Sequence, residues 1–255
     1  LMNEVSKVII GKNENLRRVT VGILSNGNML LEDFPGLAKT LLANTFARAL
    51  GCKFKRVQFT PDLLPSDIMG TYMYDQKSGD FKLRAGPLFS NILLADEINR
   101  APPKTQAALL EAMEERQITV AGNTYPLPAL FMVLATQNPI EQEGTYPLPE
   151  AQMDRFMMKI SVNYPNAEAE LAIVRMLQTE EAHQTAPREV IPQSHIFAAR
   201  DAIQKMKVSA AVEQYMVDLV MATRLPEKFV GTLANCIDIC SSPRASISSH
   251  QASRA

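Results

Sequence analysis

The sequence predicts an α/β fold, in which a largely parallel sheet of about five strands lies between helices and is followed by a smaller helical domain. Short apolar runs typical of β-strands alternate with helix-length segments through the first two-thirds of the chain, which implies crossover connections. After Tyr164-Pro165-Asn166 only helical periodicity remains. We therefore expect an α/β core over residues 1–162 and a helical domain over residues 163–255. The predicted strands are Asn28–Glu32, Phe54–Phe59, Asn91–Asp96, Leu130–Thr136 and Met157–Val162.

Two helices and two hairpins are predicted between these strands. The segment Lys39–Leu50 has apolar residues at helical spacing, and Pro103–Arg116 begins with prolines, which suit a first helical turn. Residues 72–81 read as a hairpin because a Ser-Gly turn lies between arms that carry aromatic residues. Residues 118–125 read as a second hairpin that turns at Gly122-Asn123.

The predicted helical domain contains two helix starts. Ser209 is a candidate N-cap for a helix whose apolar positions are Val212, Met216, Leu219 and Val220. The segment Ser242-Pro243-Arg244 opens another helix, and residues 180–193 read as a loop. The chain ends soon after this last helix opens, so a truncated domain is one interpretation.

Composition excludes several classes of protein. With 46% apolar residues the chain is neither disordered nor of low complexity. Its longest apolar run, Ala129–Ala135, is far shorter than the ~20 residues of a bilayer-spanning helix, and no secretory signal layout begins the chain. A net charge of −1 gives no general attraction to nucleic acid. Three cysteines are too few for a disulfide framework, which fits a cytoplasmic location.

A candidate phosphate-binding loop follows the first predicted strand. A bound phosphate chain needs backbone N–H groups at a helix N-terminus, a lysine for its β- and γ-oxygens and a hydroxyl for Mg²⁺. Lys39 and Thr40 supply the last two at the start of an amphipathic helix. Asp33 and Ala38 stand where the pattern G-x-x-x-x-G-K-[ST] has glycines, so in isolation the segment is equally a helix start with a solvated lysine.

A pair of acidic residues, Asp96 and Glu97, ends the predicted strand Asn91–Asp96. In a triphosphate site the first would hold Mg²⁺ through water, and the second would orient and polarise the attacking water. In isolation the pair would be an ordinary solvated strand end. Its occurrence together with Lys39 and Thr40 on one predicted sheet makes coincidence much less probable.

Three longer motifs resemble the MoxR family of AAA+ ATPases. They are LLADEINRAPPKTQAALLEAMEER at 93–116, ATQNP at 135–139 and EGTYPLPEAQMDRF at 143–156, and the similarity extends from Val8 to Ser246. The resemblance implies a five-stranded ATPase core, an insert hairpin in the second helix, a hairpin before the sensor 1 motif and a helical lid. The hairpins at 72–81 and 118–125 and the boundary near 163 fall where that plan puts them.

The resemblance also implies roles for matching residues. Lys39 and Thr40 match Walker A, and Asp96 and Glu97 match Walker B. The expected catalytic residues are Glu97, Asn138 as sensor 1, Arg155 as an arginine finger offered to a neighbouring subunit, and Arg244 as sensor 2. The expected nucleotide-binding residues are Val8, Ile10 and Gly11 on the adenine side, Pro35, Gly36, Leu37, Ala38, Lys39, Thr40 and Leu41 in Walker A, and Asp96; Thr40 and Asp96 would also bind Mg²⁺.

Each of these roles has a simpler alternative. Asn138 precedes a proline and could form a turn, Arg155 could pair with Asp154, and Arg244 could be a surface charge. Val8 and Ile10 could equally belong to a core element. Arg100 is a further candidate for an interface charge, with no assigned role.

The leading hypothesis is a chaperone-type ATPase that binds ATP and Mg²⁺ and remodels partner proteins as a ring. The resemblance implies a hexamer and client proteins that often contain von Willebrand A-type domains. One alternative is a nucleotide-gated binding scaffold with slow hydrolysis. Another is a nucleic-acid motor, since Lys77 and Lys82 lie beside aromatic residues in the first hairpin, although Asp75 and Asp80 balance their charge.

Overall fold

The structure is a computed structural model that describes residues 1–33, 38–138, 144–178, 187, 189–229 and 233–255. Their contacts divide them into two units, Leu1–His195 and Ile196–Ala255. This division lies later in the chain than the boundary expected near residue 163, which stays a prediction.

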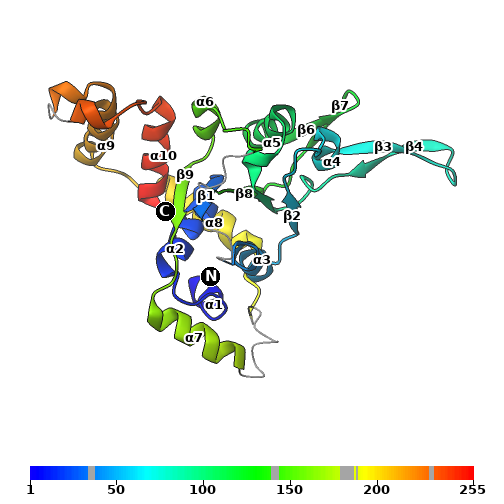
Figure 1. Cartoon of the computed structure of the whole chain (residues 1–255), viewed down its shortest axis with the longest axis horizontal. Helices are drawn as coiled ribbons and strands as arrows, with labels where there is room; N and C mark the ends of the chain where they lie inside the picture. The colour runs from blue at the N-terminus through cyan, green and yellow to red at the C-terminus, as the bar shows by residue number, and fades with distance from the viewer. Residues whose placement is uncertain (34–37, 139–143, 179–186, 188, 230–232) are drawn as a thin grey trace. The chain divides into compact units, whose positions relative to one another are not determined.

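A five-stranded parallel sheet forms the centre of the first unit, in the order β2-β5-β8-β1-β9 (Figure 1). Each strand begins and ends within two residues of its predicted bounds, so the predicted α/β sheet is confirmed. β5 and β8 lie inside the sheet, and their apolar runs are almost wholly buried. The strands are β1 (Met29–Asp33), β2 (Phe54–Gln58), β5 (Ile92–Asp96), β8 (Met132–Gln137) and β9 (Met158–Val162).

Helices cover this sheet, with α3 packed against β2 and β5 and α2 against β9. The predicted helix at 103–116 is α5, whose first residue is Pro103, where the missing N–H costs nothing. Arg116 closes α5 and donates hydrogen bonds to the carbonyl groups of Phe131 and Asn26. The helices are α1 (Met2–Val5), α2 (Asn13–Leu24), α3 (Lys39–Ala49), α4 (Pro65–Met69), η1 (Ile98–Arg100), α5 (Pro103–Glu115), α6 (Glu150–Met153) and α7 (Ala167–Gln178).

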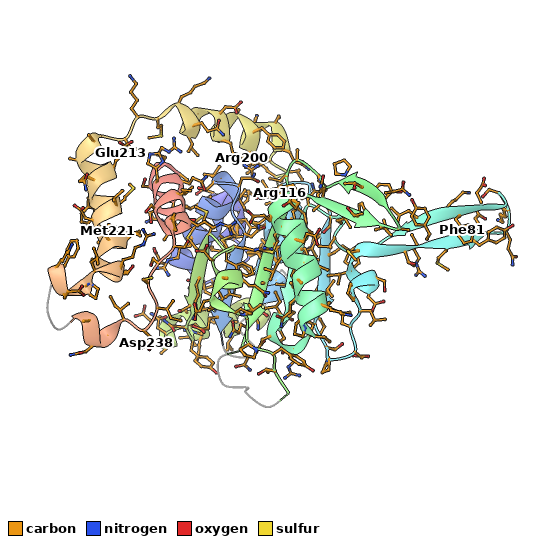
Figure 2. All side chains as sticks on the ribbon, turned by 90° about the horizontal axis from the view of Figure 1, so that it is seen from above. Phe81, Arg116, Arg200, Glu213, Met221 and Asp238 are labelled. Atoms are coloured by element: carbon orange, nitrogen blue, oxygen red, sulfur yellow. The ribbon has the colours of Figure 1, made fainter. Side chains whose placement is uncertain are left out.

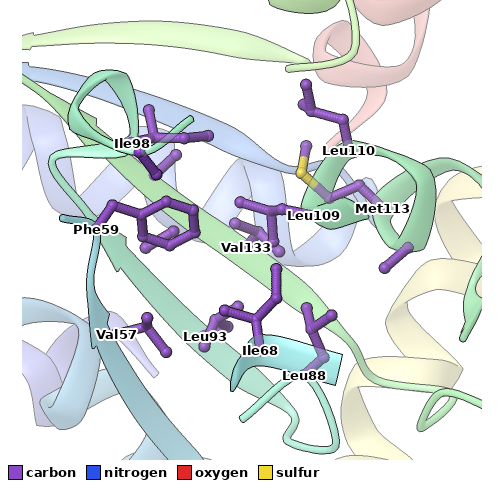
Figure 3. Packing of buried hydrophobic residues seen from close by; sticks show 14 of the residues in the cluster. Val57, Phe59, Ile68, Leu88, Leu93, Ile98, Leu109, Leu110, Met113 and Val133 are labelled. Atoms are coloured by element: carbon purple, nitrogen blue, oxygen red, sulfur yellow. The ribbon is translucent and has the colours of Figure 1, made fainter. Parts of the chain in front are cut away.

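The main apolar core lies between the sheet and α4 and α5. Side chains alternate along a strand, so Leu93 and Ala95 of β5 enter this core, whereas Asp96 lies on the opposite face. Figure 3 shows Val133 of β8 beside Leu109 of α5, and Leu93 of β5 beside Ile68 of α4. The position of Asp96 follows directly from this alternation.

Two antiparallel hairpins branch from the first unit. The strands β3 (Gly70–Asp75) and β4 (Asp80–Ala85) form a long arm that carries Phe81, as Figure 2 shows, and β6 (Gln117–Val120) pairs with β7 (Asn123–Pro126). The second turn is formed by Ala121 and Gly122, both with positive φ, one residue earlier than predicted. The hydroxyls of Tyr72 and Tyr125 share a hydrogen bond that joins the two hairpins.

The second unit contains helices and begins within α8 (Gln193–Lys205), followed by α9 (Ala210–Arg224), η3 (Pro226–Lys228), η4 (Leu233–Cys236) and α10 (Pro243–Arg254). Ser209 caps α9 as predicted, and α10 opens within the predicted segment, where the Ser242 side chain caps it. Met216 and Val220 of α9 are buried, but Leu219 is 52% exposed, so the predicted apolar face is only partly covered. Across the residues with described positions, no helix has the length and apolarity to cross a membrane.

Candidate functional site

The carboxylate of Asp96 is the centre of the site. It lies at the carboxyl end of β5 with only 7% of its side chain exposed. Oδ1 accepts a hydrogen bond from the Thr136 hydroxyl at 2.7 Å and lies 3.7 Å from Nζ of Lys39. Oδ2 accepts hydrogen bonds from Nη2 and Nε of Arg56 at 2.6 and 3.2 Å. One buried carboxylate thus joins residues from β2, β5, β8 and α3.

These contacts keep Asp96 ionised. Burial acts to raise the pKa of its carboxyl group, but hydrogen bonds from Thr136 and Arg56, together with the positive charges of Lys39 and Arg56, outweigh burial. The pKa therefore lies below the ordinary value of 3.8. At neutral pH the site holds a negative charge that a divalent cation can use.

Lys39 is the first residue of α3, so its side chain and the N-terminus of this helix lie together. Ala38 precedes it in the left-handed conformation, with φ 58°, which costs a non-glycine residue about 1 kcal/mol. This is the position where the phosphate-loop pattern has glycine, and the alanine adopts the backbone that a glycine would favour. Thr40 follows Lys39 in the first turn, where Leu41 is 43% exposed. Pro35, Gly36 and Leu37 lie outside the described residues.

Glu97, the second acidic residue, has a backbone in the left-handed region, with φ 57° and ψ 52°. Its N–H donates to Oγ1 of Thr136 at 2.8 Å, so one hydroxyl holds both Asp96 and Glu97. Its carboxylate lies 2.9 Å from Nε of Arg100. The sharp backbone turn directs the two consecutive acidic side chains to different partners.

The remaining predicted catalytic residues are spread over both units. Asn138 directly follows β8 and is buried, and Arg155 is half-buried just after α6. Arg244 belongs to the second unit as the second residue of α10, where its N–H donates to the Ser242 hydroxyl.

The predicted adenine-side residues lie between α1 and α2. Val8 is 3% exposed and belongs to the core, whereas Ile10 is half-buried. Gly11 has φ 75°, and a Cβ at this position would lie 2.5 Å from Cβ of Ala169 in α7. Only glycine therefore allows this close approach of the two segments.

The donor set fits Mg²⁺ and a polyphosphate. Mg²⁺ prefers oxygen ligands and takes one or two from protein, with phosphate oxygens and waters completing its shell. Asp96 offers an ionised carboxylate and Thr40 a hydroxyl. The N-terminus of α3 and Lys39 offer N–H groups and a positive charge for phosphate.

Sequence reasoning missed two residues of this centre. Arg56 lies on β2, and no motif identified in the sequence contained it. Thr136 lies on β8 within the motif ATQNP at 135–139, but no role was predicted for it. Each is 40 residues from Asp96 in sequence. The available signal was polarity near the carboxyl ends of predicted strands, since parallel strands bring those ends to one edge of the sheet.

Comparisons with known proteins agree with this architecture. A family model described as "ATPase family associated with various cellular activities (AAA)" matches residues 28–158. Chaperone MoxR1 of Mycobacterium tuberculosis is 45% identical over 96% of this chain, which spans 64% of that protein's length. The uncharacterized protein YeaC of Bacillus subtilis is 44% identical over 88% of this chain and 69% of its own.

A solved structure extends the comparison to three dimensions. The crystal structure of a Cytophaga hutchinsonii protein assigned as an ATPase matches with a TM-score of 0.90 and 46% identity, over 99% of this chain and 76% of that one. The range matched by the family model contains Lys39, Asp96 and Asn138. The chain belongs to the MoxR family of AAA+ ATPases.

Proposed function

We propose that this chain binds ATP with Mg²⁺, hydrolyses it, and uses the cycle to remodel partner proteins as part of a ring. The observation that carries the proposal is the meeting of Lys39 and Asp96, 3.7 Å apart, with Glu97 next in the chain. A triphosphate site needs these three groups: a cation for the β- and γ-phosphates, a carboxylate for the metal and a second carboxylate for the attacking water.

In the proposed mechanism, Lys39 and the first N–H groups of α3 bind the phosphates. Thr40 and Asp96 would hold Mg²⁺, which would neutralise charge on the phosphate oxygens. Glu97 accepts a hydrogen bond from the attacking water and polarises it, and Asn138 orients that water from the neighbouring strand. Thr136 keeps the two acidic residues in a fixed relation.

One contact favours the second candidate function, a nucleotide-gated scaffold with slow hydrolysis. The Glu97 carboxylate is paired with Arg100 at 2.9 Å, and this contact competes with a water for the same oxygen. The side chains of Glu97 and Arg100 are 26% and 39% exposed, and exposed pairs contribute about 0–1 kcal/mol. A pair this weak would slow the activation of water by Glu97 without preventing it, so we favour an ATP-hydrolysing enzyme over the scaffold.

Completion of the site by a neighbouring subunit is the second part of the proposal. Arg155 would reach the nucleotide of the next subunit in a hexamer, where an arginine finger is worth roughly 10³–10⁵ in rate. Arg244, in a helical lid beginning near residue 163, would couple the lid angle to the nucleotide. We propose a cytoplasmic protein whose clients include von Willebrand A-type domains, and the name of chaperone MoxR1 supports a chaperone role.

A nucleic-acid motor has less support. Lys82 of the β3–β4 hairpin is paired with Asp75, whose pKa is lowered by its hydrogen bonds with Lys82 and neighbouring groups. This pairing leaves the hairpin with less positive charge to offer to phosphates. Binding to DNA that weakens with added salt would reverse this preference.

Phosphate release tests the enzyme against the scaffold. We expect the wild-type chain to release phosphate from ATP, and Glu97→Gln to bind ATP without turnover. Equal and negligible turnover in both proteins, with ATP bound, would support the scaffold instead.

Mixed assemblies test the shared site. Arg155→Ala is expected to bind ATP without turnover, and mixing it with Glu97→Gln should restore part of the activity, because some interfaces would then hold one intact copy of each residue. No recovery in assemblies shown to be mixed would contradict a site shared between subunits.

A further inference from the structure

Arg56 is the residue of the site that the mechanism above does not use. It lies on β2 opposite Leu94 of β5, and its side chain reaches Asp96, two residues further along that strand. Two of its nitrogens, Nε and Nη2, donate to the same oxygen of Asp96, and Nη2 also donates to Gln58 at 3.1 Å. Asp96 therefore carries Arg56 on one oxygen and Lys39 on the other.

A purely structural role does not account for this arrangement. The strands β2 and β5 are already joined by backbone pairing from Phe54 to Gln58, without help from a side chain. The Arg56 side chain is 47% exposed, and its Nη1 has no hydrogen-bond partner within the described part of the chain. The guanidinium thus has donors to spare beside a buried carboxylate.

The spare donors lie beside Asp96, the carboxylate that also contacts Lys39. A guanidinium offers a planar fork of N–H groups that matches phosphate oxygens, and it keeps its charge at any physiological pH. Arg56 contacts Oδ2 of Asp96 and Lys39 lies near Oδ1, so both cations lie beside one carboxylate. The residue after Asp96 is Glu97, which would act at the outermost phosphate.

We propose that Arg56 is a phosphate-binding residue acting within the same chain, and that it recognises the γ-phosphoryl group of a nucleoside triphosphate. The inference rests on the proposed binding of ATP at Lys39 and Asp96. It assigns to Arg56 the discrimination between the triphosphate and the diphosphate, whereas Lys39 contributes to the binding of both.

Calorimetric binding of ATPγS and ADP to the whole chain tests this role, in Mg²⁺ and again in EDTA. We expect Arg56→Gln to weaken ATPγS binding about 10- to 100-fold, the size of a charge-assisted hydrogen bond, and ADP binding by less than about threefold. Arg56→Lys keeps the charge but not the fork, so it should lie between Arg56→Gln and wild type. Arg18→Gln is a matched control, because Arg18 is 45% exposed and paired with Glu14 on α2.

The other outcomes are informative. Equal weakening of ATPγS and ADP would mean that Arg56 only shapes the site, and an effect that vanishes in EDTA would mean that it acts through Asp96 and the metal. Either result, or no effect at all, overturns the inference. If the wild-type chain binds neither nucleotide, the proposed function fails instead. Thermal unfolding of each variant without nucleotide checks the fold, and Arg56→Lys keeps the test valid if Arg56→Gln is unstable.

Discussion

In the acidic centre formed by Lys39, Arg56, Asp96, Glu97 and Thr136, we expect the Thr136 hydroxyl to contribute to both stability and nucleotide binding. It donates to Asp96 at 2.7 Å and accepts from the Glu97 N–H at 2.8 Å, and Thr136 is fully buried. Thr136→Val has nearly the same shape but breaks both contacts. Losing a hydrogen bond to a charged group costs about 1.5–3 kcal/mol, and an N–H left without an acceptor costs about 1 kcal/mol or more.

We therefore expect Thr136→Val to lower the free energy of unfolding of the first unit by about 2–4 kcal/mol. Thr136→Ser keeps the hydroxyl and loses one buried methyl group, which costs about 1 kcal/mol. Urea unfolding, followed by circular dichroism, measures both. Since the Thr136 hydrogen bond lowers the pKa of Asp96, Thr136→Val should also raise that pKa.

The role of the hydroxyl is tested by comparing Thr136→Val with Thr136→Ser. Nucleotide binding in Mg²⁺ should be weakened in Thr136→Val and nearly normal in Thr136→Ser, because only the valine variant releases Asp96 and Glu97 from their common partner. Equal stability and equal nucleotide affinity in the two variants would refute the role assigned to the hydroxyl.

Two further predictions concern the segment before α2 and the titration of the site. Thermal unfolding should show that Gly11→Ala destabilises the chain more than Gly79→Ala. Both glycines have positive φ, but only at Gly11 would the new Cβ meet a neighbour, at 2.5 Å. Equal losses of stability in the two variants would contradict this packing. The lowered pKa of Asp96 stabilises the fold above its ordinary value of 3.8, and this contribution is lost as the pH falls through the folded-state pKa. The stability gap between wild type and Asp96→Asn should therefore be largest near neutral pH and shrink in acid, and a gap independent of pH would show that the carboxylate charge does not matter.

The sheet was predictable because its strands are short apolar runs between longer segments. β5 and β8 are buried on both faces, so every residue in them except the last is apolar or small, and such runs stand out in the sequence. The turn glycines also marked the hairpins, although Ala121 takes a left-handed conformation that no residue preference indicates. On α9 the apolar periodicity predicted burial of Leu219, which the described contacts leave half-exposed.

Only some residues of the acidic centre could be predicted from the sequence. Lys39, Asp96 and Glu97 could be identified because each belongs to a local pattern at the end of a strand or the start of a helix. Arg56 and Thr136 reach Asp96 only because β2 and β8 both flank β5 in the sheet. The sequence of a single strand does not indicate which strands lie beside it. A polar residue near a strand end is common, so its partner cannot be chosen before the strand order is known.

Binding of a non-hydrolysable ATP analogue with Mg²⁺ to wild type and Lys39→Ala tests the central claim most directly. Isothermal titration should give one bound nucleotide per wild-type chain and binding at least about 100-fold weaker in Lys39→Ala, because the ammonium beside Asp96 is then lost. Unfolding should show that Lys39→Ala keeps its fold, and Lys53→Ala, which removes an exposed lysine, should bind like wild type. Unchanged affinity in folded Lys39→Ala would contradict the assignment of this centre as the triphosphate site.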